Sequence, residues 1–175
     1  PTWCYETAES SQAVGNMGDA WHISRLNPSQ IWAQNDANGI PITGAGITVA
    51  VIDTAAQVNV SPYLSSPGTT TGAKPTWQLV NYVGDGVDIA KKLAQEGVAL
   101  QCSHGTRVVS LINAQVLEES DSNFSGMAPG VSIIAMRALT NSTSVEDQGP
   151  MAAAINDAVA AGGDIINISQ AGSDH

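Results

Sequence analysis

The strongest constraint on the fold is the run ITVAVID at residues 47–53, which is almost entirely apolar and rich in β-branched side chains. The turn residues PITGAG lead into it, and such a run predicts a strand that is buried on both faces. Strands of this kind belong to parallel sheets with helices on both sides. The run therefore indicates an α/β class of fold.

Strand-like and helix-like segments alternate along the rest of the chain. Further strands are predicted at 76–83, 131–139 and 164–169, the last of them as another buried strand. Helical patterns occupy 27–35, 88–97, 105–117 and 149–163. The last helix begins with a proline and ends at paired glycines, as helices commonly do. Parallel strands joined by helices define the α/β class, and the 175 residues contain no internal repeat or linker that would divide them.

The net charge limits the classes of binding partner, and the cysteine content bears on the cellular compartment of the protein. The chain has 16 acidic and 6 basic residues, a formal charge of -10, which excludes binding of nucleic acid or an anionic membrane through a basic face. No apolar run reaches the roughly 20 residues of a membrane-spanning helix. Cys4 and Cys102 could form one disulfide, which would fit an oxidising compartment, or remain two unrelated thiols.

Two polar residues stand where a parallel sheet carries its chemistry. Asp53 ends the first buried strand, and His104 begins a helical pattern. Functional groups of open parallel sheets lie at the carboxyl ends of strands. Alone, Asp53 reads as a turn residue and His104 as a helix-start residue. Together they predict a pair in which the carboxylate holds Nδ1 and leaves Nε2 to accept a proton.

Four segments then carry a resemblance to a known family. GAGITVAVIDT (44–54), SHGTRVV (103–109), FSGMAPGVSIIAMRAL (124–139) and AINDAVAAGGDIINIS (154–169) resemble, in that order, successive signature regions of the subtilisin-like serine proteases, or subtilases. The resemblance spans about residues 21–172. It implies a three-layer fold with a parallel sheet, of which this chain carries the first half. Residues 1–20 would form an N-terminal arm, and 21–175 the N-terminal half of the peptidase domain.

The resemblance also assigns roles to residues. It implies that Asp53 and His104 are the aspartate and the histidine of a Ser-His-Asp triad. The segment after the last strand would form one wall of the substrate cleft, through Ser169, Gln170, Ala171 and Gly172. The loop with Glu146 and Asp147 would form the opposite wall and favour basic or polar substrate side chains.

The family's chain order is Asp, His, Ser, and its serine and oxyanion-hole asparagine lie in segments beyond the strand at 164–169 that this chain does not contain. The resemblance therefore implies a serine endopeptidase whose serine lies on a missing or companion chain, together with a peptide or protein substrate and a secreted or extracellular location. The alternative is a catalytically inactive subtilase-like module that binds peptides or serves as a scaffold. Nucleic acid and membrane are not expected partners.

Some residues depart from the family's pattern. Arg107 stands in place of a second histidine, where a helix-surface charge is the simpler role, and Ala55 and Ser110 stand in place of glycines. The resemblance suggests calcium, but the acidic turn with Glu118, Glu119 and Asp121 lacks alternating ligand spacing, so we expect no cofactor and no metal site.

Two other classes of enzyme fit the residues less well. A dinucleotide-binding domain would have its glycine loop after the first strand, whereas Gly44 and Gly46 precede it. A phosphatase with a strand-end aspartate nucleophile would have a second aspartate at the position of Ala55.

Overall fold

A computed structural model of the chain describes residues 25–54, 56, 77–81, 104–114, 125–138 and 149–169. Several residues singled out in the sequence lie outside this part. They are the arm at 1–20, the helix predicted at 88–97, Cys4, Cys102, Ala55, Glu118, Glu119, Asp121, Glu146, Asp147, Gln170, Ala171 and Gly172.

The described residues form a four-stranded parallel sheet with the order β2-β3-β1-β4. The strands are β1 (Thr48–Asp53), β2 (Trp77–Asn81), β3 (Ser132–Arg137) and β4 (Ile165–Asn167). All four begin within the segments predicted as strands. The central strand β1 pairs with β3 on one side, where Asp53 stands opposite Arg137, and with β4 on the other.

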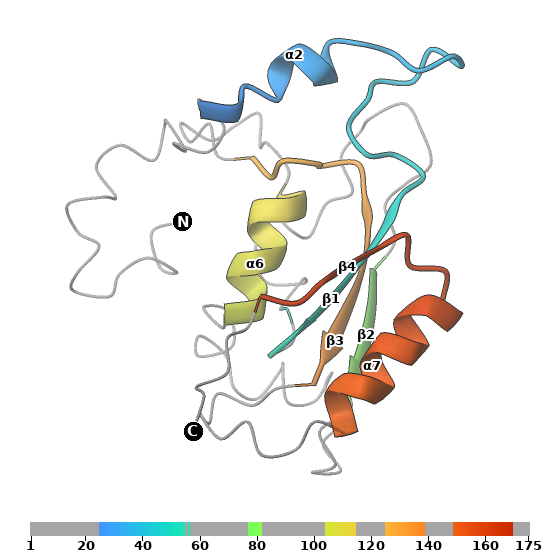
Figure 1. Ribbon diagram of the computed structural model, residues 1–175. Helices are drawn as coiled ribbons and strands as arrows, with labels where there is room; N and C mark the ends of the chain where they lie inside the picture. The colour runs from blue at the N-terminus through green and yellow to red at the C-terminus, as the bar shows by residue number, and fades with distance from the viewer. Residues whose placement is uncertain are drawn as a thin grey trace, which may run out of the picture.

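Helices cover the sheet on both sides, so the domain has three layers (Figure 1). Helix α6 (His104–Asn113) lies against one face and helix α7 (Gly149–Ala160) against the other. A short helix α2 (Ser29–Trp32) precedes the sheet, and its Trp32 indole N–H donates to the carbonyl of Met127 at 3.2 Å. This arrangement confirms the α/β fold and the parallel sheet that the sequence predicts.

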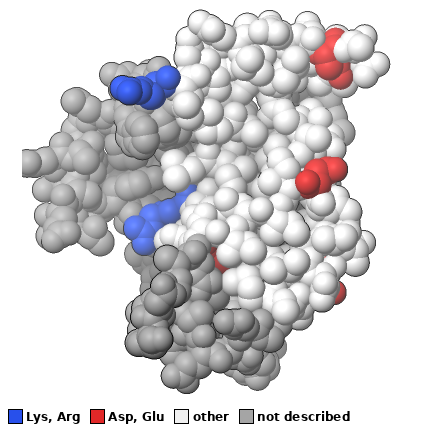
Figure 2. Space-filling model, viewed as in Figure 1, with Lys and Arg blue, Asp and Glu red and all other residues white. Residues whose placement is uncertain are grey.

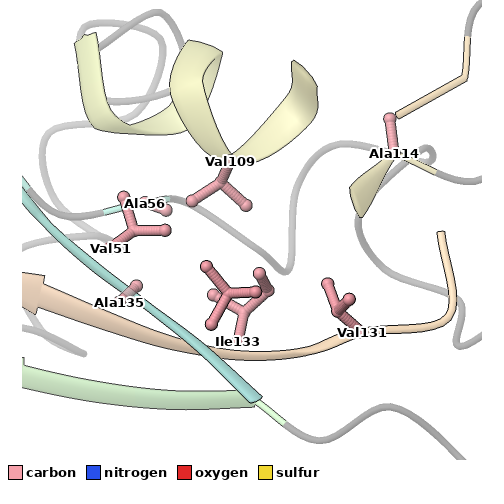
Figure 3. Packing of buried hydrophobic residues seen from close by; sticks show 8 residues of the cluster. Val51, Ala56, Val109, Ala114, Val131, Ile133 and Ala135 are labelled. Atoms are coloured by element: carbon pink, nitrogen blue, oxygen red, sulfur yellow. The ribbon is translucent and has the colours of Figure 1, made fainter. Parts of the chain in front are cut away.

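Side chains of the central strands alternate between two cores, which explains the continuous apolar run. Val49 and Val51 face α6, where Val109 points down between Val51, Ala56 and Ile133 (Figure 3). Ala50 and Ile52 face the other way and pack against Ala154 and Ala158 of α7. Successive residues of a strand point to opposite faces. A strand covered on both faces must therefore be apolar at its buried positions, as residues 49–52 are.

Helix α6 ends earlier than predicted because a neighbouring segment occupies its last carbonyl groups. The backbone N–H groups of Gly126, Met127 and Ala128 donate to the carbonyls of Ala114, Leu111 and Ile112 at 2.8–2.9 Å. A Cβ on Gly126 would lie 2.5 Å from the backbone of Ile112 and Asn113, so only glycine permits this approach. The helix that begins at His104 is thus anchored at its far end.

The strand β4 is formed as predicted, but it is not buried. Its side chains are exposed or half-buried, with Ile165 54% exposed, and the following Ile168 is 42% exposed. Among the described strands it pairs with β1 alone, and so it forms an edge of the sheet. The apolar pattern of β4 resembles that of β1, but only β1 lies between two other strands.

The described surface is poor in charge, and Figure 2 shows only scattered acidic and basic side chains on this face. Within the part of the chain that the structure describes, no helix is long and apolar enough to cross a membrane.

Candidate active site

Asp53 is the last residue of β1 and is fixed there by both its backbone and its side chain. Its carbonyl accepts the N–H of Ala138 at 3.0 Å, and its Oδ1 accepts the N–H of Thr54 at 2.6 Å. The residue is only 1% exposed. Burial of a carboxylate is costly unless hydrogen bonds satisfy it, so the position of Asp53 depends on the donors around it.

The principal side-chain donor is His104, the first residue of α6. Its Nδ1 lies 3.0 Å from Oδ1 and 2.9 Å from Oδ2 of Asp53. The structure therefore brings together the two residues that the sequence pairs across 51 positions. The His104 side chain is 53% exposed, so one side of the ring contacts the carboxylate and the other remains accessible.

This geometry assigns the tautomer of the neutral imidazole. An ionised carboxylate can only accept hydrogen bonds, so Nδ1 must carry the proton that faces Asp53. The other ring nitrogen, Nε2, then has a lone pair available. A histidine held in this way can accept a proton at Nε2, while the carboxylate stabilises the imidazolium that forms. The pair has the chemistry of a general base.

Thr54 connects the two elements that carry the pair, a role that sequence reasoning missed. Its N–H contacts Asp53, and its Oγ1 accepts the N–H of Gly105 at 3.1 Å. Helix capping is usually recognised in sequence from a hydroxyl residue immediately before the helix. Here the hydroxyl comes from 51 positions away, so the local pattern around His104 gave no indication of it.

The structure gives ordinary helix-surface and helix-backbone roles to Arg107 and Ser110, two of the residues that depart from the family pattern. The Arg107 side chain is exposed on α6, in agreement with a helix-surface charge. The Ser110 hydroxyl donates to the carbonyl of Thr106, one turn earlier, at 2.8 Å. In the described part of the chain, neither residue forms a hydrogen bond or an ion pair with Asp53 or His104.

Of the predicted cleft wall, the structure describes only Ser169. It lies shortly after β4, separated from Asn167 by Ile168, and its hydroxyl donates to Oδ1 of Asn167 at 2.8 Å. Because β4 runs parallel to β1, Ser169, which comes after β4, and Asp53, the last residue of β1, both lie toward the carboxyl edge of the sheet. Within the described ranges, no three His, Cys, Asp or Glu side chains form a group that could hold a metal ion.

The chain is thus an α/β domain of three layers that carries an aspartate–histidine pair at the carboxyl edge of its parallel sheet. The model of the subtilase family, Peptidase S8, matches residues 44–174. The chain therefore belongs to the subtilase family, as the sequence resemblance indicates.

Known relatives agree with this assignment. Mycosin-4 of Mycobacterium tuberculosis (strain ATCC 25618 / H37Rv) is 33% identical over 172 residues, which cover 93% of this chain and 31% of that protein. The chain thus spans about a third of the length of this curated relative.

Solved structures show the same fold. MycP1 with its N-terminal propeptide removed matches with a TM-score of 0.54 and 25% identity, over 86% of this chain and 37% of that chain. MycP1 from Mycobacterium smegmatis matches in fold, with a TM-score of 0.55 and 23% identity, over 86% of this chain and 36% of that chain.

Proposed function

We propose that this chain is the part of a serine endopeptidase that supplies the acid and the base of a Ser-His-Asp triad, Asp53 and His104. The serine would lie on a segment outside this chain. The observation that carries the proposal is the contact of His104 Nδ1 with Asp53 Oδ2 at 2.9 Å, on a histidine whose side chain is 53% exposed. Membership of the subtilase family supports the same reaction class.

In the proposed reaction, Nε2 of His104 takes the proton of the serine hydroxyl as its oxygen attacks the carbonyl carbon of a peptide bond. Asp53 stabilises the imidazolium through the Nδ1 proton. The imidazolium then protonates the leaving amine as the carbon–nitrogen bond breaks, which leaves an ester on the serine. A water molecule, deprotonated by the same histidine, hydrolyses the ester and restores the serine.

We propose further that residues 21–175 form the N-terminal half of the peptidase domain, preceded by an arm at 1–20. A companion chain with the C-terminal half would pack beside β4. This strand pairs only with β1 among the described strands. Its first residue, Ile165, is 54% exposed, and Ile168, just after its end, is 42% exposed. An open strand edge with apolar side chains favours association. After denaturation, an intact-mass spectrum of the purified protein should show a second polypeptide or a longer chain.

The substrate would be a peptide or protein. We propose that it lies along Ser169, Gln170, Ala171 and Gly172 as an added strand held by main-chain hydrogen bonds, with Glu146 and Asp147 on the opposite wall. Ser169 supports this proposal through its position shortly after β4, toward the edge of the sheet where β1 ends in Asp53.

We propose that the protein acts outside the cytoplasm, as a secreted or extracellular enzyme. One solved relative, with a TM-score of 0.53 and 25% identity over 86% of this chain, is described as a serine protease MycP1 that is an essential component of the type VII (ESX-1) secretion system. That description supports, for this chain, a place in or near a secretion system.

A fluorophosphonate that labels activated serines tests the proposal in the full-length protein or the two-chain complex. We expect labelling of the companion segment, and its loss in His104→Ala. Asp36→Asn is the matched control, because this acidic residue is exposed and its Oδ1 accepts the N–H groups of Asn38 and Ile40, contacts that asparagine can keep. Unlabelled wild-type protein, or equal labelling of His104→Ala, would contradict the proposal and favour a binding module.

A further inference from the structure

Thr54 makes contacts on both sides of the proposed acid–base pair. Its backbone N–H donates to Oδ1 of Asp53 at 2.6 Å, and its hydroxyl oxygen accepts the N–H of Gly105, the residue after His104, at 3.1 Å. The residue is only 8% exposed. One buried side chain therefore joins the end of β1 to the start of α6.

The start of α6 depends on this contact. The first N–H groups of a helix have no carbonyl partner within the helix, and Gly105 is buried, where water cannot easily replace a lost partner. The Thr54 hydroxyl supplies that partner from another element. It acts as a helix cap from a distance.

Among the described residues, Asp53 is the one hydrogen-bond partner of the His104 ring. The His104 side chain is 53% exposed, whereas Asp53 is almost completely buried. Accurate placement of the ring against the carboxylate must therefore come mainly from the backbone of α6. The far end of that backbone is anchored by Gly126, Met127 and Ala128, and the near end by Thr54.

We propose that the Thr54 hydroxyl is a positioning group that sets the distance between His104 and Asp53 and thereby selects the Nδ1–H tautomer. The expected effect of Thr54 on catalysis rests on the proposed function. Its expected effect on the tautomer of His104 does not. As a positioning group, Thr54 touches neither the substrate nor the reacting atoms. It acts through Gly105 and the first turn of α6.

The substitution Thr54→Val isolates the hydroxyl. Valine has nearly the same shape and keeps the N–H that donates to Asp53, but it leaves the Gly105 N–H without an acceptor. Thr54→Ser keeps the hydroxyl and serves as the rescue. Thr43→Val is the matched control, because Thr43 is also 8% exposed and its hydroxyl makes only a 3.5 Å contact with the carbonyl of Pro41.

Two readouts are measured in the full-length protein or the two-chain complex. Nitrogen-15 NMR with labelled histidine, assigned by the loss of signal in His104→Ala, gives the fraction of the Nδ1–H tautomer of the neutral ring. Peptide hydrolysis gives kcat and KM. We expect Thr54→Val to lower the Nδ1–H fraction and to reduce kcat about tenfold with KM nearly unchanged, since small displacements of reacting groups are costly. Thr54→Ser and Thr43→Val should stay close to wild type in both.

An unchanged tautomer in Thr54→Val, or an equal change in Thr43→Val, would overturn the inference. The NMR measurement keeps its meaning even in a protein without peptidase activity, so failure of the proposed function is distinguishable. Hydrogen exchange of the Gly105 N–H in the unmodified protein adds a test that needs no variant. We expect slow exchange, and exchange at the rate of an open amide would also contradict the proposal.

Discussion

The carboxyl end of β1 and the edge strand β4 differ sharply, although both come from apolar runs that end in polar residues. Asp53, at the end of β1, is 1% exposed, lies opposite Arg137 of β3 and is within 3.0 Å of His104. Ile165, at the start of β4, is 54% exposed, and its strand has β1 as its single described partner. One region is enclosed by elements of this chain, and the other is open.

The two regions correspond to two parts of the proposed active site, the acid–base pair and the substrate wall. The proposed acid–base pair is carried by β1 and α6, which pack against each other and beside β3 within this chain. The proposed substrate wall follows β4, whose outer side has no described cover. We therefore expect the aspartate–histidine pair to depend on contacts within this chain, and the cleft to depend on what packs beside β4.

The largest expected effect is that of Asp53→Asn in the full-length protein or the two-chain complex. Asparagine keeps the shape but can donate an N–H toward Nδ1, which favours the tautomer with the proton on Nε2. We expect kcat for peptide hydrolysis to fall by about four orders of magnitude, the size of effect known for this change in a serine-protease triad. Steady-state kinetics with a chromogenic peptide gives the value, with Asp36→Asn as the control. A loss below tenfold would mean that the pair is not the catalytic base.

The second prediction concerns the enclosed region. Ile133 of β3 is 1% exposed and belongs to the core between the sheet and α6. We expect Ile133→Ala to lower the free energy of unfolding by about 2–5 kcal/mol, because the truncation leaves a cavity. Ile133→Val should cost about 0.5–1.5 kcal/mol. Urea denaturation followed by circular dichroism measures both. Equal midpoints for the alanine variant and wild type would show that this core is not tightly packed.

Much of this enclosed region was predictable from sequence. Residues 49–52 and 133–136 are apolar at successive positions because each strand faces two cores, and that pattern is local. The pairing of Asp53 with His104 followed from the family resemblance and from the rule that strand ends meet at one edge. The overall class and the central strands therefore needed no long-range information.

The remaining features depend on contacts between distant segments. The end of α6 at Asn113 follows from the N–H groups of 126–128, which occupy the helix carbonyls. The exposure of β4 depends on its place in the sheet order, which its own residues do not encode. The contact of Thr54 with Gly105 joins segments 51 positions apart. The local pattern of apolar and polar residues cannot predict contacts between such distant segments.

The third prediction sharpens the comparison at the open edge. In the full-length protein or the two-chain complex, a companion segment that covers β4 would bury Ile165. We then expect Ile165→Ala to lower the free energy of unfolding by about 1–3 kcal/mol, because burial of an isoleucine side chain contributes a free energy of this size. Leu111→Ala is the control, because Leu111 is 46% exposed and belongs to α6 and not to β4. Costs within about 0.5 kcal/mol for both variants, the usual range for surface positions, would show that the edge stays open.

The smallest expected effect is that of Arg107→Gln on α6, three positions after His104. The side chain is exposed, so we expect the free energy of unfolding to change by no more than about 0.5 kcal/mol. The value of kcat/KM should stay within about twofold of wild type, since an exposed charge is screened by solvent and salt. Urea denaturation and peptide hydrolysis measure the two quantities, with Arg107→Lys as the variant that keeps the charge. A tenfold loss of kcat/KM in Arg107→Gln that Arg107→Lys restores would mean that this charge acts on the site, because the helix surface alone gives no reason for such a loss.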